Sequence, residues 1–246
     1  MNFKTWLKHY RKRRKIQRVK PHFWHLPAAD GGQGLGYIQN YKAGTRSIRQ
    51  AAALYLMKQL PENEGREITY DEVTEDVVER FDKLNSGFYL PNTIRQKWPD
   101  LPIFTFVRNP LSRLYSCYAN KVLDAGKSGG KLPFEALGVT ADMSFDEFVQ
   151  IVATIPDERA ERHFRSQAWF LSADGKLITD YIGKIERFNE DWEELREKFG
   201  MPPSPHNNRS SMGKADFSTF YSKESYRLAT ERYRGDIELF GYQNDV

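Results

Sequence analysis

Short apolar runs alternate with longer stretches of helical periodicity along most of the chain. Apolar runs with the length of a buried strand predict three strands, at Tyr37–Asn40, Ile103–Val107 and Tyr181–Ile185. Apolar positions that recur every three or four residues predict helices, at 46–60, 71–83, 144–154, 156–170, 189–199 and 222–238. This alternation is typical of an α/β fold with a central, mostly parallel sheet flanked by helices.

Local signals mark where several of these elements begin and end. Asn109 and Pro110 follow the second predicted strand; Asn is a good N-cap, and Pro suits the first helical position. Pro61 ends the first predicted helix, and Gly200 ends the helix that precedes a loop predicted at 201–215. We therefore expect a further helix to open directly after the second strand.

The first twenty residues differ in charge from the rest of the chain. The 246 residues hold 37 Lys and Arg against 33 Asp and Glu, a net charge of +4. Nine of these bases lie within residues 1–20, where no acidic residue occurs, so the remaining residues hold 28 bases against 33 acids. We predict a basic N-terminal arm at 1–30 and a single domain at 31–246.

Apolar residues of the arm are spaced as in an amphipathic helix, at Phe3, Trp6, Leu7 and Tyr10. Such a helix would bind an anionic membrane surface, with its bases among the lipid headgroups. The alternative is an arm that packs on the protein's own body or stays unfolded. The arm has neither the long apolar region nor the cleavage site of a signal peptide.

Composition excludes several classes of protein. No apolar stretch approaches the ~18 residues that a membrane-spanning helix needs. A single cysteine, Cys117, excludes an internal disulfide framework and a cysteine-based zinc finger, and it fits a reducing compartment. We expect a cytoplasmic protein that lies at the inner face of a membrane if the arm binds lipid.

The turn after the first predicted strand, Lys42-Ala43-Gly44-Thr45-Arg46-Ser47, carries residues suited to phosphate binding. It leads into a helix, whose N-terminus offers N–H donors and a partial positive charge. Gly44 lets the backbone approach an anion. Thr45 and Ser47 supply hydroxyl donors, and Lys42 supplies a mobile positive charge. The alternative is an ordinary polar helix start, and the turn lacks the P-loop NTPase signature G-x-x-x-x-G-K-[ST].

The turn after the second predicted strand carries arginines and hydroxyls. Arg108 comes directly after this buried strand, where a charged side chain needs a partner. Arg113 and Ser116 share one side of the following helix. Arg108, Ser116 and either Ser112 or Arg113 can therefore converge on one anion, which the planar fork of arginine binds well. The alternative is that Arg108 pairs with a carboxylate of the protein.

The second turn resembles a known phosphate-binding motif. Arg108-Asn109-Pro110-x-x-Arg113-x-x-Ser116-x-Tyr118 closely resembles the 3′-phosphate-binding motif of the sulfotransferases, in particular of the carbohydrate sulfotransferase branch in its bacterial type. The first turn, Lys42–Ser47, is similar to the 5′-phosphosulfate loop of that family. Further similarities follow in the family's order, at His163–Gln167, Tyr181–Glu186, His206–Ser210 and Tyr233–Tyr242.

The resemblance implies a P-loop-like sulfotransferase fold and an enzyme of the EC 2.8.2 type. Such enzymes move a sulfuryl group from 3′-phosphoadenosine 5′-phosphosulfate (PAPS) to an acceptor by in-line transfer without a metal, leaving 3′-phosphoadenosine 5′-phosphate (PAP). The branch implies a carbohydrate or glycolipid hydroxyl as the acceptor. Lys42 would stabilise charge on the leaving phosphate. The residues implied to bind PAPS are Lys42, Ala43, Gly44, Thr45, Arg46, Ser47, Arg108, Arg113, Ser116 and Ser210.

The chain departs from the family pattern in both turns and in the general base. Tyr41 stands where the family has Pro, Arg46 where a small or hydroxyl residue is common, and Asn109 where it has Asp. No histidine lies between the two phosphate motifs, where many relatives place the base. A base must reach the acceptor proton within hydrogen-bond distance, and the candidates are His163 and Asp71. The alternatives are a structural hydrogen bond for His163 and, for most of the acidic stretch 71–82 that contains Asp71, a solvated helix face.

Two other functions compete with this prediction. A P-loop-type kinase or NTPase would use similar turns, but the chain lacks the lysine–hydroxyl signature and a clear magnesium-binding acid after a strand. A non-catalytic nucleic-acid-binding protein would use the basic arm. The net negative charge of the remaining residues argues against a second basic surface, so we expect no nucleic-acid partner.

Overall fold

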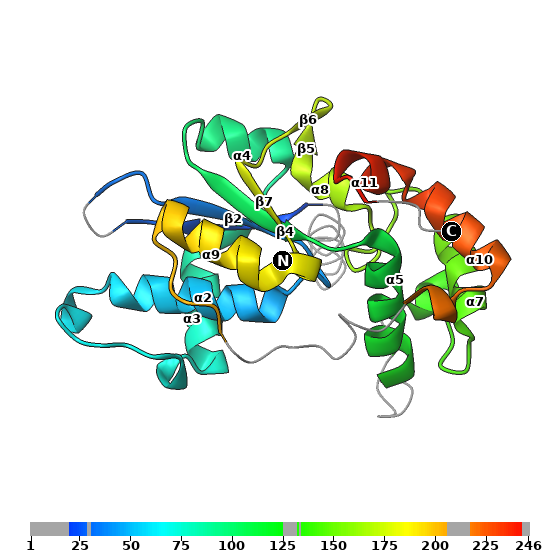
Figure 1. Ribbon diagram of the computed structural model, residues 1–246, viewed down its shortest axis with the longest axis horizontal. Coiled ribbons are helices and arrows are strands. Elements are labelled where there is room, and N and C mark those ends of the chain that lie inside the picture. Colours follow the sequence, from blue (N-terminus) through cyan, green and yellow to red (C-terminus); the bar gives the residue numbers. More distant parts are fainter. Residues whose placement is uncertain (1–19, 29–30, 125–131, 133, 206–216, 243–246) are drawn as a thin grey trace, which may run out of the picture. The chain divides into compact units, whose positions relative to one another are not determined.

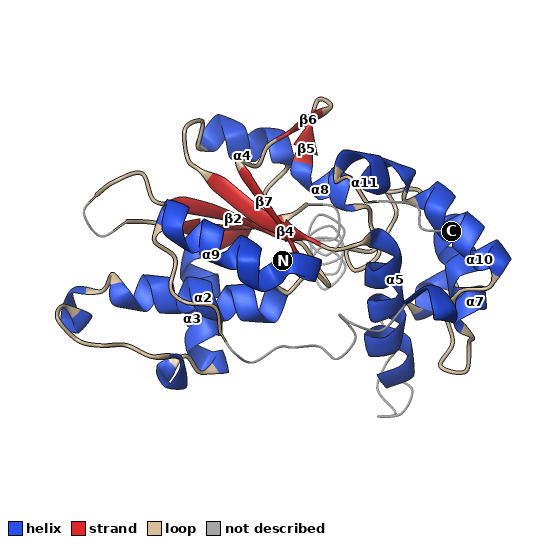
Figure 2. Ribbon diagram, in the orientation of Figure 1, coloured by secondary structure: helices blue, strands red, loops and turns tan. Residues whose placement is uncertain are grey.

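The structure is a computed structural model that describes residues 20–28, 31–124, 132, 134–205 and 217–242. The chain forms two compact units, Met1–Val107 with Phe170–Arg209 (unit 1) and Arg108–Trp169 with Ser210–Val246 (unit 2). Figures 1 and 2 show the elements of both units. The single domain expected at 31–246 stays a prediction.

Unit 1 contains a five-stranded sheet in the order β3-β1-β2-β4-β7. Its strands are β1 (His22–Leu26), β2 (Leu35–Gln39), β3 (Ser86–Phe88), β4 (Ile103–Val107) and β7 (Tyr181–Lys184). The strands β2, β4 and β7 are parallel, whereas β1 pairs antiparallel with both β2 and β3. A separate hairpin is formed by β5 (Ser172–Ala173) and β6 (Lys176–Leu177).

The predicted α/β class with a central sheet flanked by helices is confirmed, but the sheet is mixed rather than mostly parallel. The three strands predicted from apolar runs are confirmed as β2, β4 and β7, and these are the parallel ones. The sequence analysis missed β1 and β3. The first lies inside the segment predicted as an arm, and the second is only three residues long, too short to show strand periodicity.

A row of aromatic side chains crosses the sheet of unit 1. In the strand register, Trp24 lies opposite Tyr37, Tyr37 opposite Phe104, and Phe104 opposite Tyr181. Opposite residues point to the same face. This face packs against α2 (Thr45–Lys58), α3 (Glu75–Asn85) and α9 (Phe188–Phe199). Among its described residues, unit 1 also contains α4 (Pro91–Lys97) and the 3-10 turns Pro61–Asn63, Tyr70–Glu72 and Ile185–Arg187.

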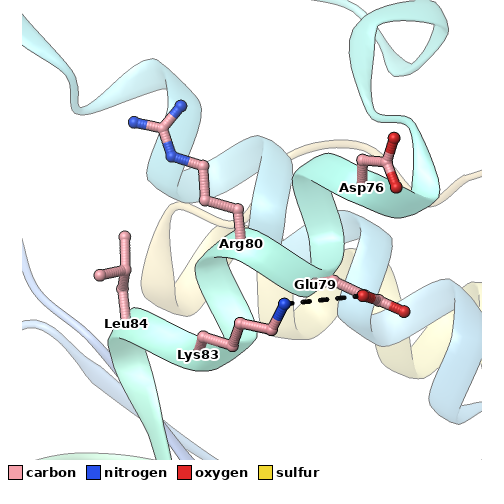
Figure 3. A pocket seen from close by; sticks show the side chains of 5 residues that line it. All are labelled: Asp76, Glu79, Arg80, Lys83 and Leu84. Atoms are coloured by element: carbon pink, nitrogen blue, oxygen red, sulfur yellow. Dashed lines mark ion pairs between the residues drawn. The ribbon is translucent and has the colours of Figure 1, made fainter.

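The helix α3 buries an apolar side and exposes a charged one. Val78 and Phe81 are buried in the core of unit 1. The other side carries an ion pair of 3.9 Å between Glu79 and Lys83, among the exposed side chains that Figure 3 draws: Asp76, Glu79, Arg80, Lys83 and Leu84. This arrangement favours a solvated helix face as the interpretation of the acidic stretch.

Unit 2 is built from helices around its own core, which includes Leu114, Phe148, Phe164 and Tyr233. Its described helices are α5 (Pro110–Tyr118), continued by a π-helical turn at Ala119–Leu123, α7 (Phe145–Ala153), α10 (Lys223–Arg232) and α11 (Arg234–Leu239), with 3-10 turns at Glu135–Leu137 and Phe217–Phe220. The short helix α8 (Gln167–Leu171) begins in unit 2 and ends in unit 1.

Two helix predictions are wrong in part. The helix expected at 156–170 is present only as α8, and the one expected at 222–238 is divided at Tyr233 into α10 and α11. Between 156 and 166, side chains bind the backbone. The N–H of Ser166 donates to Asp157 (3.0 Å), and Arg113 donates to the carbonyl of Arg165 (2.7 Å). These tertiary bonds compete with the i→i−4 bonds that a helix would make.

The described part of the predicted arm forms a strand of the sheet, because His22–Leu26 is β1, between β3 and β2. Residues 1–19 lie outside the described residues, so its amphipathic helix stays a prediction. The predicted loop residues 206–215, with Ser210 among them, lie outside them too. In the described ranges, no helix combines the length and the apolar character that crossing a membrane requires.

Candidate functional site

The first predicted phosphate loop lies at the carboxyl end of β2, in unit 1. Asn40 is the residue after β2, and its side-chain amide donates to the carbonyl of Phe106 on β4 (3.0 Å). Its own carbonyl accepts from the N–H of Ala43 (3.2 Å) and from the hydroxyl of Thr45 (3.0 Å). The loop is therefore held over the ends of two parallel strands, the edge where open α/β sheets bind ligands.

Two residues of this loop have left-handed backbone conformations. Gly44 has a φ of 71° and Lys42 a φ of 69°. Glycine adopts this conformation freely, whereas a non-glycine residue there is strained by about 1–3 kcal/mol. Such strain persists only where the surrounding structure imposes it, and it gathers at binding and catalytic sites. The strained residue is the lysine that the sequence predicts to be catalytic.

The N-terminus of α2 has no side-chain cap. Gly44 is its N-cap and has no side chain that can accept from the first N–H groups. The first turn of α2 also contains no acidic residue. The N–H groups and the partial positive charge of this helix end therefore favour an anion. Thr45 and Ser47 belong to this first turn, and Arg46 between them is exposed.

Replacing Gly44 with alanine should destabilise the protein by about 1–3 kcal/mol. An added Cβ would lie 2.7 Å from Cδ1 of Ile185 while the backbone kept its left-handed φ. Gly65→Ala is a matched control, because the φ of Gly65 is 72° but its added Cβ would meet nothing within 4 Å. Urea unfolding of both variants separates the clash from the backbone strain. Equal losses of stability would show that contact with Ile185 contributes nothing.

The second predicted phosphate motif opens α5, in unit 2. The side-chain oxygen of Asn109 accepts from the N–H groups of Leu111 (3.0 Å) and Ser112 (3.2 Å), which confirms the predicted cap. The cap occupies N–H groups that an anion would otherwise use. Anion binding at α5 therefore depends on side chains rather than on the helix end.

Arg108 is buried and oriented by a hydrogen bond. Only 7% of the residue is exposed, and its Nε donates to Oγ of Ser112 (3.0 Å). This bond sets the plane of the guanidinium, on which bidentate binding of phosphate depends. Ser116, the third residue of the predicted set, is buried one turn further along α5.

Arg113 contacts the main chain of unit 2. The residue is 1% exposed; its Nη1 donates to the carbonyl of Arg165 (2.7 Å) and its Nη2 to that of Arg162 (3.3 Å). Both carbonyls lie in the segment that precedes α8. Arg113 therefore holds this segment in place, and its contact with a phosphate stays a prediction.

His163 forms a hydrogen-bonded pair with Glu161 in unit 2. Its Nδ1 lies 2.7 Å from Oε2 of Glu161, which also accepts from the N–H of His163 (2.8 Å). The neutral ring therefore carries its proton on Nδ1 and its lone pair on Nε2. Burial lowers the pKa of His163 below its usual value, and this outweighs the opposing effect of Glu161. A neutral imidazole oriented by a carboxylate is suited to general-base catalysis.

Both phosphate motifs and the histidine fall within one family match. A family model described as the sulfotransferase family matches residues 42–243. The chain belongs to the sulfotransferase family. The match begins at Lys42 and includes residues of both units, and membership supports transfer of a sulfuryl group. Neither the curated proteins nor the solved structures compared with the chain include a match.

Two predicted site residues of this sulfotransferase, Asp71 and Ser210, remain to be located. Asp71 is exposed, in the 3-10 turn Tyr70–Glu72 of unit 1. Ser210 lies outside the described residues. Where the structure describes the chain, no group of three His, Cys, Asp or Glu side chains could hold a metal ion.

Sequence reasoning missed three residues that the structure places around the predicted ones. Glu161 orients His163 but carries no signal in the sequence. Gln167 and Asp236 bind the backbone at Arg108 and at α8. Gln167 and Asp236 lie in the segments His163–Gln167 and Tyr233–Tyr242, which resemble the sulfotransferase family. That resemblance is the sequence signal by which both residues could have been found.

Proposed function

We propose that this protein transfers a sulfuryl group from PAPS to a hydroxyl of a carbohydrate or glycolipid acceptor, in line and without a metal. The observation that carries the proposal is the loop of residues 40–47. It combines a strained lysine with an uncapped helix N-terminus at the end of a parallel strand, in a chain of the sulfotransferase family. PAPS supplies the sulfuryl group, already bonded to a phosphate leaving group.

The residues of unit 1 fit the 5′-phosphosulfate end of PAPS. The N–H groups at the start of α2 and the hydroxyls of Thr45 and Ser47 would hold the 5′-phosphate. The ammonium of Lys42 would stabilise the negative charge that develops on the leaving oxygen. Because the left-handed backbone at Lys42 is set before the donor binds, little reorganisation is needed during transfer.

The residues of unit 2 fit the 3′-phosphate of the donor. Arg108 would bind it with its planar fork, and Ser116 would add a hydroxyl donor. Arg113 and Ser210 are the further predicted ligands of the donor. The 3′-phosphate distinguishes PAPS from ATP and ADP, so these side chains carry the donor specificity.

We assign the general base to His163, with Asp71 as the alternative. Glu161 holds the histidine in the tautomer that accepts a proton on Nε2, whereas Asp71 is exposed. Transfer activity that survives in His163→Ala would overturn this assignment.

The carbohydrate acceptor rests on the resemblance of Arg108–Tyr118 to the carbohydrate branch. Binding of residues 1–20 to an anionic membrane stays a prediction from their charge. The cytoplasmic location of the protein, at the inner face of that membrane, stays a prediction too.

Thermal melting with three nucleotides tests the proposed function. PAP at 100 times its Kd should stabilise the protein by about 2.7 kcal/mol, or roughly 5–10 °C for a chain of this length. AMP, and ADP with magnesium, should shift the melting temperature much less, because neither carries a 3′-phosphate. Equal shifts with PAP and with ADP and magnesium would favour the P-loop NTPase alternative instead.

A further inference from the structure

Gln167 binds both backbone polar groups of Arg108. Its Oε1 accepts from the N–H of Arg108 (2.9 Å), and its Nε2 donates to the carbonyl of Arg108 (2.8 Å). Gln167 is fully buried, with 0% exposed. This pair of bonds is the one that a neighbouring strand would make. These bonds fix the backbone of Arg108, whose guanidinium is proposed to bind the 3′-phosphate.

Asp236, on α11, holds Gln167 in turn. Its Oδ2 accepts from the N–H of Gln167 and its Oδ1 from the N–H of Ala168, both at 2.8 Å. Its carboxylate also lies 3.5 Å from the side-chain amide of Gln167. Asp236 is 0% exposed, and burial raises its pKa above the usual value. The N–H donors of Gln167 and Ala168 and the positive charge of Arg113 oppose this rise, because each favours the carboxylate of Asp236.

The two ends of this chain of contacts are fixed independently. At one end, Nε of Arg108 donates to Ser112 on α5 (3.0 Å). At the other, Arg113 donates to the carbonyls of Arg162 and Arg165, just before Gln167. The side chain and the backbone of Arg108 are thus set by separate partners. On the backbone side, one side chain, Gln167, binds both the N–H and the carbonyl.

The geometry points to Gln167, held by Asp236, as a positioning residue that presents Arg108 to the 3′-phosphate of the donor. This inference rests on the proposed function. It assigns Gln167 no contact with the donor. It requires that a change at Gln167 alter affinity only for ligands that carry a 3′-phosphate.

Gln167→Met tests the inference, because methionine has a similar shape but makes neither bond to Arg108. We expect the Kd for PAP to rise about tenfold, which corresponds to the loss of one charge-assisted hydrogen bond between Arg108 and the 3′-phosphate. The Kd for AMP should stay unchanged. Isothermal titration calorimetry measures both. Tyr221→Phe is the control: it removes one hydrogen bond in unit 2, to the carbonyl of Leu111 (2.9 Å), and should change neither Kd.

Gln167→Glu supplies a second test that does not depend on stability. Below its pKa the introduced carboxyl still offers one acceptor and one donor for the two bonds that the amide makes to Arg108; above it, the carboxylate cannot donate to the carbonyl of Arg108. Burial and the adjacent carboxylate of Asp236 would raise that pKa, whereas the positive charges of Arg108 and Arg113 would lower it. Relative to the wild type at the same pH, PAP affinity should recover as the pH falls from about 8 to about 6.

The outcomes separate the inference from the function on which it rests. A wild-type protein with equal affinity for PAP and AMP contradicts the proposed function itself. A wild type that prefers PAP, with a Gln167→Met variant that keeps the full preference, overturns the positioning role alone. So does an equal loss of affinity for both ligands, or a Gln167→Glu variant whose PAP affinity, relative to the wild type, does not change with pH.

Discussion

Arg108→Ala should remove the preference of the protein for PAP over AMP. The guanidinium can make two charge-assisted hydrogen bonds to one phosphate, each worth about 1.5–3 kcal/mol. We therefore expect the Kd for PAP to rise by roughly 100-fold or more. The Kd for AMP should not change, because AMP has no 3′-phosphate for Arg108 to bind. Calorimetric titration of the variant with each ligand measures the two values.

Arg227→Ala is the matched control in the same unit. Arg227 is exposed and pairs with Glu224 on its own helix (2.8 Å), so its loss should change neither affinity. Arg108→Lys keeps the charge but loses the fork and the bond from Nε to Ser112, and should give an intermediate Kd. If Arg108→Ala binds PAP as tightly as the wild type does, Arg108 is not a ligand of the 3′-phosphate.

Lys42→Gly should separate stability from activity in unit 1. Glycine adopts a φ of 69° freely, and relief of this strain offsets the greater freedom of glycine in the unfolded chain, so the melting temperature should not fall. Loss of the ammonium should slow release of PAP from PAPS by about 10²–10³-fold, the range for removing one group that stabilises transition-state charge. The release can be followed with water as the acceptor.

Asp174→Gly is the control for the backbone effect. Asp174 is the other non-glycine residue with a positive φ among the described residues, at 49°, and it lies in the exposed turn between β5 and β6. Its replacement should relieve strain without changing the rate of release. A Lys42→Gly variant that releases PAP as fast as Asp174→Gly would exclude a role for Lys42 in transfer.

Strong local signals explain the elements that sequence reasoning located well. The strand β4 occupies its predicted range, because four apolar residues around one threonine, all buried, suit a strand that is buried on both faces. The helix α5 begins at Asn109 and Pro110 because a cap acts within one turn of the chain. For the same reason α9 ends at Gly200, which adopts the left-handed conformation.

Contacts remote in sequence explain the elements that it missed. The strand β1 pairs with β3, and His22 lies opposite Phe88, 66 positions later in the chain. No pattern near His22 in the sequence reveals that partner. The helical periodicity at 156–170 is real, but Asp157 and Arg113 bind the backbone groups that a helix would use. Tertiary bonds therefore override local preference in this segment.

The order of residues alone established the α/β class, the two turns after strands and the motifs of the sulfotransferase family, because each of these depends on neighbours within a few turns of chain. Only the tertiary structure showed that Lys42 is left-handed, that Glu161 orients His163, and that Gln167 and Asp236 hold Arg108. The bonds at Gln167 join residues 59 and 69 positions apart. Burial demands that such groups be paired, since each unpaired one would destabilise the fold by about 1–3 kcal/mol, but which donor meets which acceptor is decided by packing.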